Sequence, residues 1–450
     1  SVSSEAAAAT RVSYLTACAR GRALACRGMS AAGNVLAWVV IVNSVGVMAC
    51  SNGSDSRPQE EGSRCAAPRG CDIQEATCVQ AVLEVTACVR GEEVPALPTI
   101  RHLNQREYRD ELTTDALDVQ MASGQLDRLL QRLHLLPAQT TAIEQRVNEQ
   151  AEQTLALFDA KTKRITIVEG AIQSAPLDEM VLLSHELTHY LQDLRHPLTE
   201  LSKQYESTLD QTLSLRALLE GEALVSSLHV LERIAGSPVG WSSVLASTDD
   251  SVFTNIADSP AQLHAAALSL PYALGAHYVA DVWHYNSRAH VDDLFEEAPH
   301  SLIDWLAGYG DGKLQASRVE PLDCALPHAP DGYELVLRND FGAAGLIALL
   351  AAAGDLDDTL TARHLRASAL AVYAPQGEDS EDPDASMLVW RMRFASAEVA
   401  RELADRLPWD DVGVRVFDRE VVLAVGPNVT RDAPPSEVDT CPTFDEPSAR

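Results

Sequence analysis

The stretch Ser184-His185-Glu186-Leu187-Thr188-His189-Tyr190 decides how the rest of the chain is interpreted. His185 and His189 are four residues apart, so on a helix their imidazoles lie one above the other on one face and can bind one metal ion. Glu186 is offset by one residue, where its carboxylate would lie near the metal without being a ligand. The pattern predicts a zinc site on a helix. The alternative is a surface helix on which His and Glu residues are scattered.

The flanking sequence predicts a strand and a buried helix around this motif. Residues 164–168 alternate in polarity as a strand does. Pro176 and Pro197 mark the start and the end of the helix, and acidic residues in its first turn favour its dipole. Apolar residues recur at helical spacing and should face a core: Met180, Leu183, Leu187, Leu191 and Leu194.

A second helix, predicted over about 208–234, carries the third candidate ligand, Glu220. Its apolar face comprises Leu213, Ala217, Leu224, Leu228 and Leu231, and Glu220 falls on the same face. A buried carboxylate needs a cation, which is either the metal ion or an arginine such as Arg216. Glu222 lies about 200° farther around the helix and is expected to face solvent or to support the site indirectly. With the two histidines and with Glu186 as general base, Glu220 predicts a zinc metallopeptidase.

Composition limits the classes of partner. The chain has 450 residues, of which 65 are acidic and 35 basic, giving a formal net charge of −30. This charge argues against nucleic acid or an anionic membrane surface as a partner bound through electrostatics. The hydrophobic fraction of 46% is sufficient for a core and excludes a disordered chain.

The N-terminal segment predicts export. Residues 1–28 contain four arginines among small residues and are interpreted as upstream translation or an extended signal region, with Met29 as a candidate start. The apolar stretch 34–47 is too short to span a bilayer and has the length of a signal-peptide core. VMAC at 47–50 resembles the bacterial lipobox, which implies cleavage before Cys50 and a lipid anchor on it. We therefore expect a bacterial cell-envelope lipoprotein, attached in the periplasm or to the outer membrane. The alternative is a secreted protein cut at an ordinary signal site.

The cysteines agree with export. Beyond Cys50 an even six remain: Cys65, Cys71, Cys78, Cys88, Cys324 and Cys441. Four of them fall within 65–88, a segment too short to have its own core, so disulfides within it are expected. Cys324 and Cys441 are expected to pair with each other or with that segment. None of the four close cysteines has the C-x-x-C spacing of a zinc ribbon.

Composition also divides the chain. We predict an upstream and signal segment (1–50), a linker (51–64), a disulfide-bonded segment (65–90), a zincin-like metallopeptidase domain (91–330), a C-terminal α+β module (331–425) and an acidic, Pro-rich tail (426–450). Further helices are expected over 260–287, 334–353 and 396–407, and strands over 367–373, 387–394, 412–417 and 421–425. The predicted fold class is α+β and predominantly helical.

These motifs resemble a known group of enzymes. HELTH followed by a Glu on a separate helix is similar to the gluzincin arrangement of the thermolysin-like clan, and EGEA at 220–223 resembles the E-G-x-A segment of aminopeptidase-type gluzincins. The chain more closely resembles bacterial, often exported metallopeptidases carrying HELTHALQDQ and ALVEGDA. The matching stretches are HELTHYLQDL (185–194), RALLEGEALV (216–225), LHLLPA (133–138), LFDAKTKRITIV (157–168), LPYALGAHYVADVW (270–283) and MLVWRMRF (387–394), and the resemblance spans about 110–425. It breaks at 300–305, where HSLIDW replaces a Thr-Glu-Gln-x-Leu-His-Pro-like run, so substrate contacts of that loop are not carried over.

The resemblance implies a zincin-like core with a zinc helix, a preceding strand and a downstream helix that bears the third ligand. Zinc would bind His185, His189 and Glu220, leaving one position open as in catalytic sites. Glu186 would take a proton from the attacking water and pass it to the leaving amine.

The donor that stabilises the transition state is less constrained by the sequence. Tyr272, His277 and Tyr278 in the LPYALGAHY stretch are the candidates, and Tyr272 is favoured. Asp193, four residues after His189, could orient that imidazole, or it could equally be a cap or pair with Arg195.

Three functions remain open at this point. The leading prediction is an exported zinc endopeptidase or aminopeptidase that acts on a protein or peptide. A catalytically silent lipoprotein could instead keep the protease fold as a binding or assembly scaffold. A zinc hydrolase acting on a non-peptide amide is the third.

Overall fold

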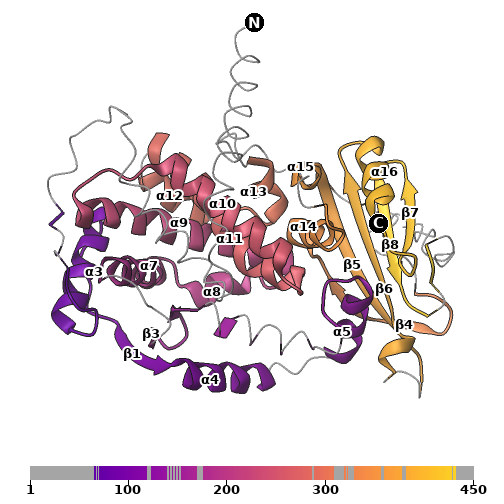
Figure 1. Cartoon of the computed structure of the whole chain (residues 1–450), viewed down its shortest axis with the longest axis horizontal. Helices are drawn as coiled ribbons and strands as arrows, with labels where there is room; N and C mark the ends of the chain where they lie inside the picture. Colours follow the sequence, from indigo (N-terminus) through magenta and orange to yellow (C-terminus); the bar gives the residue numbers. More distant parts are fainter. Residues whose placement is uncertain are drawn as a thin grey trace, which may run out of the picture. The chain divides into compact units, whose positions relative to one another are not determined.

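The computed structural model describes residues 65–431, with internal gaps. The gaps are residues 67, 69, 119–122, 139–140, most of 142–153, 170–175, 286–287, 309–318, most of 321–328, 356–358, 378–381 and 428. The described chain is α+β and predominantly helical, as predicted (Figure 1). The signal segment, the linker 51–64, Cys50, Cys324 and Cys441 lie outside the described residues.

The first part of the described chain forms a small mixed sheet with helices beside it. Its elements are α3 (Ala76–Arg90), β1 (Thr99–Asn104), α4 (Gln105–Asp118), α5 (Ser123–Arg132), β2 (Ala156–Asp159) and β3 (Arg164–Glu169). The strand order is β1-β3-β2, with β1 parallel and β2 antiparallel to β3. The strand predicted over 164–168 is therefore confirmed, and it precedes the motif helix. The sequence indicates a turn over 158–163, and β2 ends within this stretch, at Asp159.

The central part is helical. It consists of α7 (Pro176–Arg195), α8 (Leu198–Lys203), α9 (Leu209–Ala235), α10 (Trp241–Asp258), α11 (Gln262–Tyr285), α12 (Arg288–Glu296) and α13 (Leu302–Gly308). The Thr208 side chain accepts a hydrogen bond from the Gln211 N–H and so fixes the start of α9. The helix ends at Gly236, whose φ of 66° suits a glycine. The predicted apolar face of α9 is buried in full.

The apolar face of the motif helix α7 is confirmed except at its end. Met180, Leu183, Leu187 and Leu191 are buried, whereas Leu194 is 53% exposed. Helical spacing correctly places Leu194 on the stripe, but the residue lies in the last turn, beyond the elements that cover the rest of the helix. The prediction that Leu194 belongs to the core is wrong.

Two glycines allow α9 and α11 to approach closely. A Cβ added to Gly221 would lie 2.3 Å from the backbone carbon of Gly275, and one added to Gly275 would lie 1.7 Å from the Ala217 carbonyl oxygen. Only hydrogen at both positions permits this contact. As a result, Tyr272, one turn before Gly275 on α11, is brought toward Glu220, which precedes Gly221 on α9.

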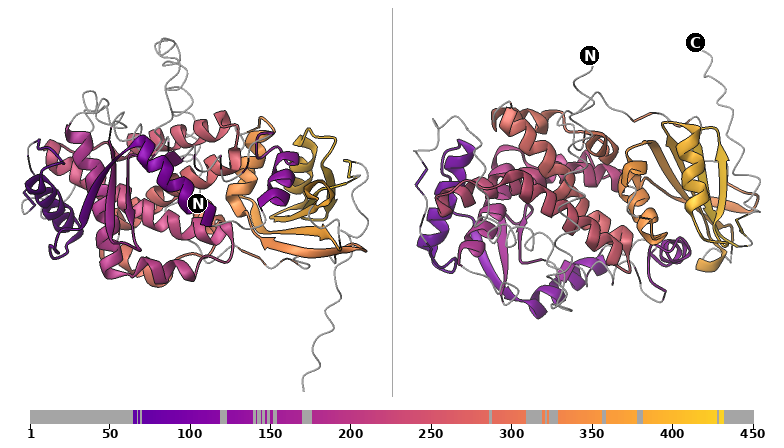
Figure 2. Two further views of the ribbon diagram at one scale, coloured as in Figure 1. Left: turned by 90° about the horizontal axis from the view of Figure 1, so that it is seen from below. Right: turned by 45° about the horizontal axis from the view of Figure 1, so that its top comes forward.

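The last part is an antiparallel sheet with helices on one face. It contains β4 (Tyr333–Asn339), α14 (Gly342–Ala352), α15 (Thr359–Ala362), β5 (Leu365–Pro375), the 3-10 turn η4 (Pro383–Ala385), β6 (Met387–Phe394), α16 (Ala397–Arg406), β7 (Gly413–Phe417) and β8 (Glu420–Val425). The strand order is β4-β5-β6-β8-β7. Figure 2 shows α16 lying against one face of this sheet, and apolar residues of α14 and α16 share one core with it. The predicted strands β5 to β8 and helix α16 are confirmed.

One predicted helix is wrong in part. The run 334–353 was expected to be one helix, yet residues 333–339 form β4 and only 342–352 are helical. In YELVLRN the side chains alternate between half-buried and exposed, which is a strand period that its leucines obscured. Gly342, the first residue of α14, adopts a φ of 50°, which suits a glycine where the chain turns from β4 into the helix.

Two disulfides close the first described segment. Cys65 is bonded to Cys88, and Cys71 to Cys78, so the expectation of local bridges is confirmed. The alternative in which Cys324 or Cys441 pairs with this segment is wrong, because its four cysteines are bonded to one another. Disulfides are typical of oxidising compartments. Within the described residues, no helix is both long and apolar enough to cross a membrane.

Candidate metal centre

Three side chains from α7 and α9 converge on one point. The Nε2 atoms of His185 and His189 are 3.2 Å apart, and the Oε2 atom of Glu220 lies 3.2 Å from the first and 3.3 Å from the second. The three donor atoms thus form a nearly equilateral triangle. Both histidines come from one face of α7, and Glu220 comes from the face of α9 packed against it.

The size of this triangle fits a metal ion. Two ligands bound tetrahedrally at about 2.0–2.1 Å are about 3.3 Å apart, which agrees with all three separations. Two imidazole nitrogens and one carboxylate oxygen are also a donor set that such ions accept. This group could therefore hold a metal ion, and in the described residues it is the one His, Cys, Asp or Glu cluster of this kind.

The charges of the three residues depend on one another. Burial opposes ionisation of Glu220, but hydrogen bonds with His185 and His189 hold its pKa well below the ordinary value. Burial also opposes protonation of His189, yet the hydrogen bond and the charge of Glu220 raise its pKa to about 9. The site therefore favours positive charge at its centre, which a metal ion would supply in place of a proton.

Glu186 lies beside this triangle and is buried, with 5% of its surface exposed. Its Oε2 atom accepts a hydrogen bond of 2.7 Å from the backbone N–H of Phe158 in β2. Burial raises the pKa of the carboxyl, and the two histidines act in the opposite direction. A carboxyl group with a raised pKa is suited to accept a proton near neutral pH.

The three candidate donors on α11 point to different places. The ring of Tyr272 stacks on His185 at 6.0 Å between centroids, and burial followed by the charge of Glu220 raises its pKa well above the ordinary value. Tyr272 is therefore held as a neutral phenol beside the three ligands. His277 bonds to Asp249 at 2.9 Å, and Tyr278 packs edge-on against Trp305. Of the three, the structure brings Tyr272 to the site.

Arg216, the alternative cation for Glu220, is also at the site. Its Nη2 atom lies 3.6 Å from Glu220 Oε1, and its Nη1 atom donates to the Ala267 carbonyl oxygen. The arginine therefore faces one carboxylate oxygen while the histidines face the other. The two explanations for a buried carboxylate at position 220 are compatible.

The residue that bonds to the Nδ1 atom of His189 is not the one that the sequence suggested. Gln192, not Asp193, contacts the imidazole: the distance between His189 Nδ1 and Gln192 Oε1 is 2.8 Å. Asp193 instead accepts hydrogen bonds from Lys163 and from the Leu198 N–H at the start of α8, which agrees with the capping alternative. Residue 192 is i+3 from His189 and lies on its helix face, whereas the i+4 position extends past the imidazole toward α8 and the Lys163 loop.

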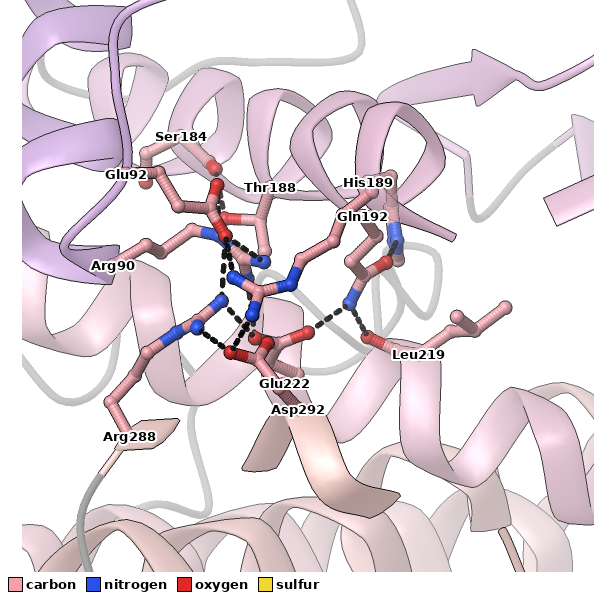
Figure 3. Close-up of polar contacts among 11 residues, drawn as sticks. Arg90, Glu92, Ser184, Thr188, His189, Gln192, Leu219, Glu222, Arg288 and Asp292 are labelled. Atoms are coloured by element: carbon pink, nitrogen blue, oxygen red, sulfur yellow. Dashed lines mark hydrogen bonds and ion pairs between the residues drawn. The ribbon is translucent and has the colours of Figure 1, made fainter. Parts of the chain in front are cut away.

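The prediction that Glu222 faces solvent is wrong. Glu222 is fully buried and accepts hydrogen bonds from Arg90, Arg288 and Gln192 (Figure 3). The expected rotation away from Glu220 is correct, but the opposite side of α9 is covered by α3 and α12 rather than by water. Support of the site through another residue, the second expectation for Glu222, agrees with its bond to Gln192.

Several of these partners were missed by the sequence. Gln192 could have been found from its i+3 spacing to His189 on a helix already predicted. Arg90 and Arg288 have no such signal, because they are 132 and 66 residues from Glu222. The Phe158 N–H is a backbone group that almost every residue type has, so the sequence could not identify it as a partner of Glu186.

Comparison of the chain with protein-family models, with curated proteins and with solved structures finds no match.

Proposed function

We propose that the chain is a zinc-dependent metallopeptidase of the gluzincin type with a zincin-like core. The observation that carries the proposal is the triangle of His185, His189 and Glu220 donor atoms with the Glu186 carboxylate buried beside it. Three protein ligands with an open position are typical of catalytic zinc, whereas structural zinc has four protein ligands.

The positions of the side chains suggest a chemical role for each residue. When bound, zinc supplies Lewis-acid activation of water and of the scissile carbonyl group. Glu186 accepts one proton from the water as its oxygen forms the new bond to the carbonyl carbon, and delivers that proton to the amine when the C–N bond breaks. The neutral Tyr272 hydroxyl donates a hydrogen bond to the carbonyl oxygen as negative charge develops there. The Phe158 N–H keeps the Glu186 carboxylate oriented.

The sheet favours a peptide over another amide as substrate. The Val168 N–H donates to the Leu155 carbonyl oxygen, and antiparallel bonding alternates along β2, so the backbone groups of Ala156 and Phe158 face away from β3. The Phe158 N–H on this side reaches Glu186. An extended peptide pairing with such an edge would run past the candidate base.

The proposed location is the bacterial cell envelope or the medium. The disulfides agree with an oxidising compartment. The lipobox-like stretch ending at Cys50 supports a lipid-anchored protein, and a secreted form is the alternative. Palmitate labelling of cells that express the full chain, compared with a Cys50→Ala variant, tests the anchor.

The decisive experiment replaces the candidate base. Glu186→Gln should bind one zinc per chain, as measured by metal analysis, and should cleave a casein and peptide-library panel at least about 100-fold more slowly than wild type. Glu179→Gln, on the same helix but outside the centre, is the matched control and should keep wild-type activity. Wild-type rates in Glu186→Gln would show that the mechanism is wrong. Bound zinc without cleavage of any peptide by the wild-type chain would favour the scaffold alternative.

A further inference from the structure

The amide of Gln192 is fully buried and fully bonded. Its Oε1 atom contacts Nδ1 of His189 at 2.8 Å, and its Nε2 atom contacts the Leu219 carbonyl oxygen at 3.0 Å and Glu222 Oε2 at 2.9 Å. Leu219 O and Glu222 Oε2 can only accept hydrogen bonds, so the amino group must face them and the amide oxygen must face His189. Nδ1 of His189 is therefore the donor, and its Nε2 atom faces His185 and Glu220.

The direction of this amide is set by the charge on Glu222. That carboxylate is buried without contact to water, which requires positive partners. Arg90 and Arg288 both donate to its Oε1 atom, while Oε2 accepts from Gln192 (Figure 3). Because the Leu219 carbonyl oxygen and the carboxylate that faces both arginines are acceptors, turning the amide over would place its oxygen against two acceptors.

The arginines are themselves fixed by a second layer of carboxylates. Glu92 accepts from Arg90 at 3.0 Å and from Arg288 at 2.7 Å, and Asp292 accepts from Arg288. These contacts join the C-terminal end of α3 to α12 and to α9. The docking of α3 does not need them, because Val82, Leu83 and Ala87 already pack into a core shared with α7. A buried charge network stabilises a fold little more than apolar residues of the same volume would.

We propose that Gln192 is a positioning residue for the metal ligand His189, and that Glu222, held by Arg90 and Arg288, positions Gln192. In its reference to a bound metal this inference rests on the proposed function. The network fixes the His189 ring so that Nε2 points to the centre before a metal arrives, which lowers the reorganisation needed for binding. Partners of this kind typically alter metal affinity 10- to 100-fold.

The test measures zinc affinity of the full chain by competition with a chromophoric chelator. Gln192→Met, which removes the amide, should weaken zinc binding about 10- to 100-fold and change the visible spectrum of the cobalt(II)-substituted protein. Glu222→Gln should weaken zinc binding by a smaller factor, since a neutral side chain no longer fixes the amide. The matched control is Glu420→Gln in the C-terminal sheet, where Glu420 is likewise buried and bonded to two arginines, Arg391 and Arg393. The zinc affinity of Glu420→Gln should stay within about 2-fold of wild type.

A double variant provides rescue. Gln192→Glu with Glu222→Gln keeps an acceptor for His189 and a hydrogen bond between positions 192 and 222, and it leaves the net charge unchanged. It loses the hydrogen bond to the Leu219 carbonyl oxygen, so it should bind zinc more tightly than Gln192→Met but less tightly than wild type. Gln192→Met and Glu222→Gln with wild-type zinc affinity and wild-type cobalt spectra would overturn the proposal, because a merely structural network would change stability alone.

A metal-free measurement separates this proposal from the proposed function. In the proton NMR spectrum of chain labelled with 15N-histidine, the Nδ1–H signal of His189 should be protected from exchange in wild type and lost in Gln192→Met. If wild type binds zinc but cleaves nothing, the proposed function fails while the affinities still decide the role of Gln192. If wild type binds no metal, the proposed function fails and the NMR signal decides. An unprotected signal in wild type would overturn the proposal in either case.

Discussion

Asp210, in the first turn of α9, and Glu222, in the middle of the same helix, are both buried carboxyl groups, with exposed fractions of 2% and 0%. Glu222 is surrounded by Arg90, Arg288 and Gln192, and its pKa is lowered despite burial. Asp210 lies beside a second carboxyl group, that of Asp340, and accepts hydrogen bonds from Ser301 and from backbone N–H groups. Burial and then the charge of Asp340 raise the pKa of Asp210 to about 8.

The difference shows that one helix can hold buried carboxyl groups in opposite charge states. Near the candidate metal centre the charge is retained, because an ionised Glu222 is needed to fix the neighbouring amide. At the junction of α9 with β4 and α14 the proton is retained, and no cation is needed there. Gly342 is part of this junction, since a Cβ at this position would lie 1.8 Å from the Asp210 carboxylate. The groups that surround each carboxyl group, and not its place on α9, determine whether it is ionised.

The largest expected effect is at Glu222. Glu222→Leu leaves Arg90 buried without the carboxylate that faces it, so the free energy of unfolding should fall by about 3–5 kcal/mol. Urea unfolding monitored by circular dichroism at pH 7 measures the change. A loss below about 1 kcal/mol would mean that Glu92 and Asp292 compensate the arginines without Glu222, and the contrast with Asp210 would disappear.

The next effect concerns the end of α3 that carries Arg90. Cys88, two residues before Arg90, is bonded to Cys65 across a separation of 23 residues. Replacing both cysteines by alanine should lower the free energy of unfolding by about 3 kcal/mol through the greater entropy of the unfolded chain. The pair Cys71 and Cys78 closes a shorter loop, of separation 7, and its removal should cost less. Hydrogen exchange should then rise in α3 and remain unchanged at Asp210.

The smallest expected effect has the opposite sign and depends on pH. Burial raises the pKa of both Asp210 and Asp340, so the folded chain keeps a proton on this pair at pH values where the unfolded chain, with carboxyl pKa values near 4, has lost it; wild-type stability therefore falls as pH rises above about 4. Asp210→Asn does not titrate and should be more stable than wild type by on the order of 2 kcal/mol at pH 8, with a smaller gain at pH 5. Equal gains at pH 5 and pH 8 would show that Asp210 is ionised in the fold.

Local spacing predicted much of the fold and of the centre. The four-residue separation of His185 and His189 needs only a helix to bring two nitrogens together. The apolar stripe of α9 placed Glu220 on the packed face in the same way, and alternation identified β3 and β5 to β8. The prediction of one helix over 334–353 was wrong because leucine-rich strands and helices differ only in the period of their apolar residues. β4 has only 7 residues, which is too short for its period to stand out beside the helix that follows.

The sequence by itself determined the elements and the residue types that they present to each other: a motif helix, a carboxylate on a neighbouring apolar face, and cysteines close enough to bond locally. Only the tertiary structure decided which distant groups complete them. Whether Glu222 met water or arginine depended on where Arg90 and Arg288 lay, and whether His189 was oriented by Gln192 or Asp193 depended on what covered α7. Periodicity acts over a few residues, whereas the free energy of a buried charge depends on partners that folding brings from anywhere in the chain.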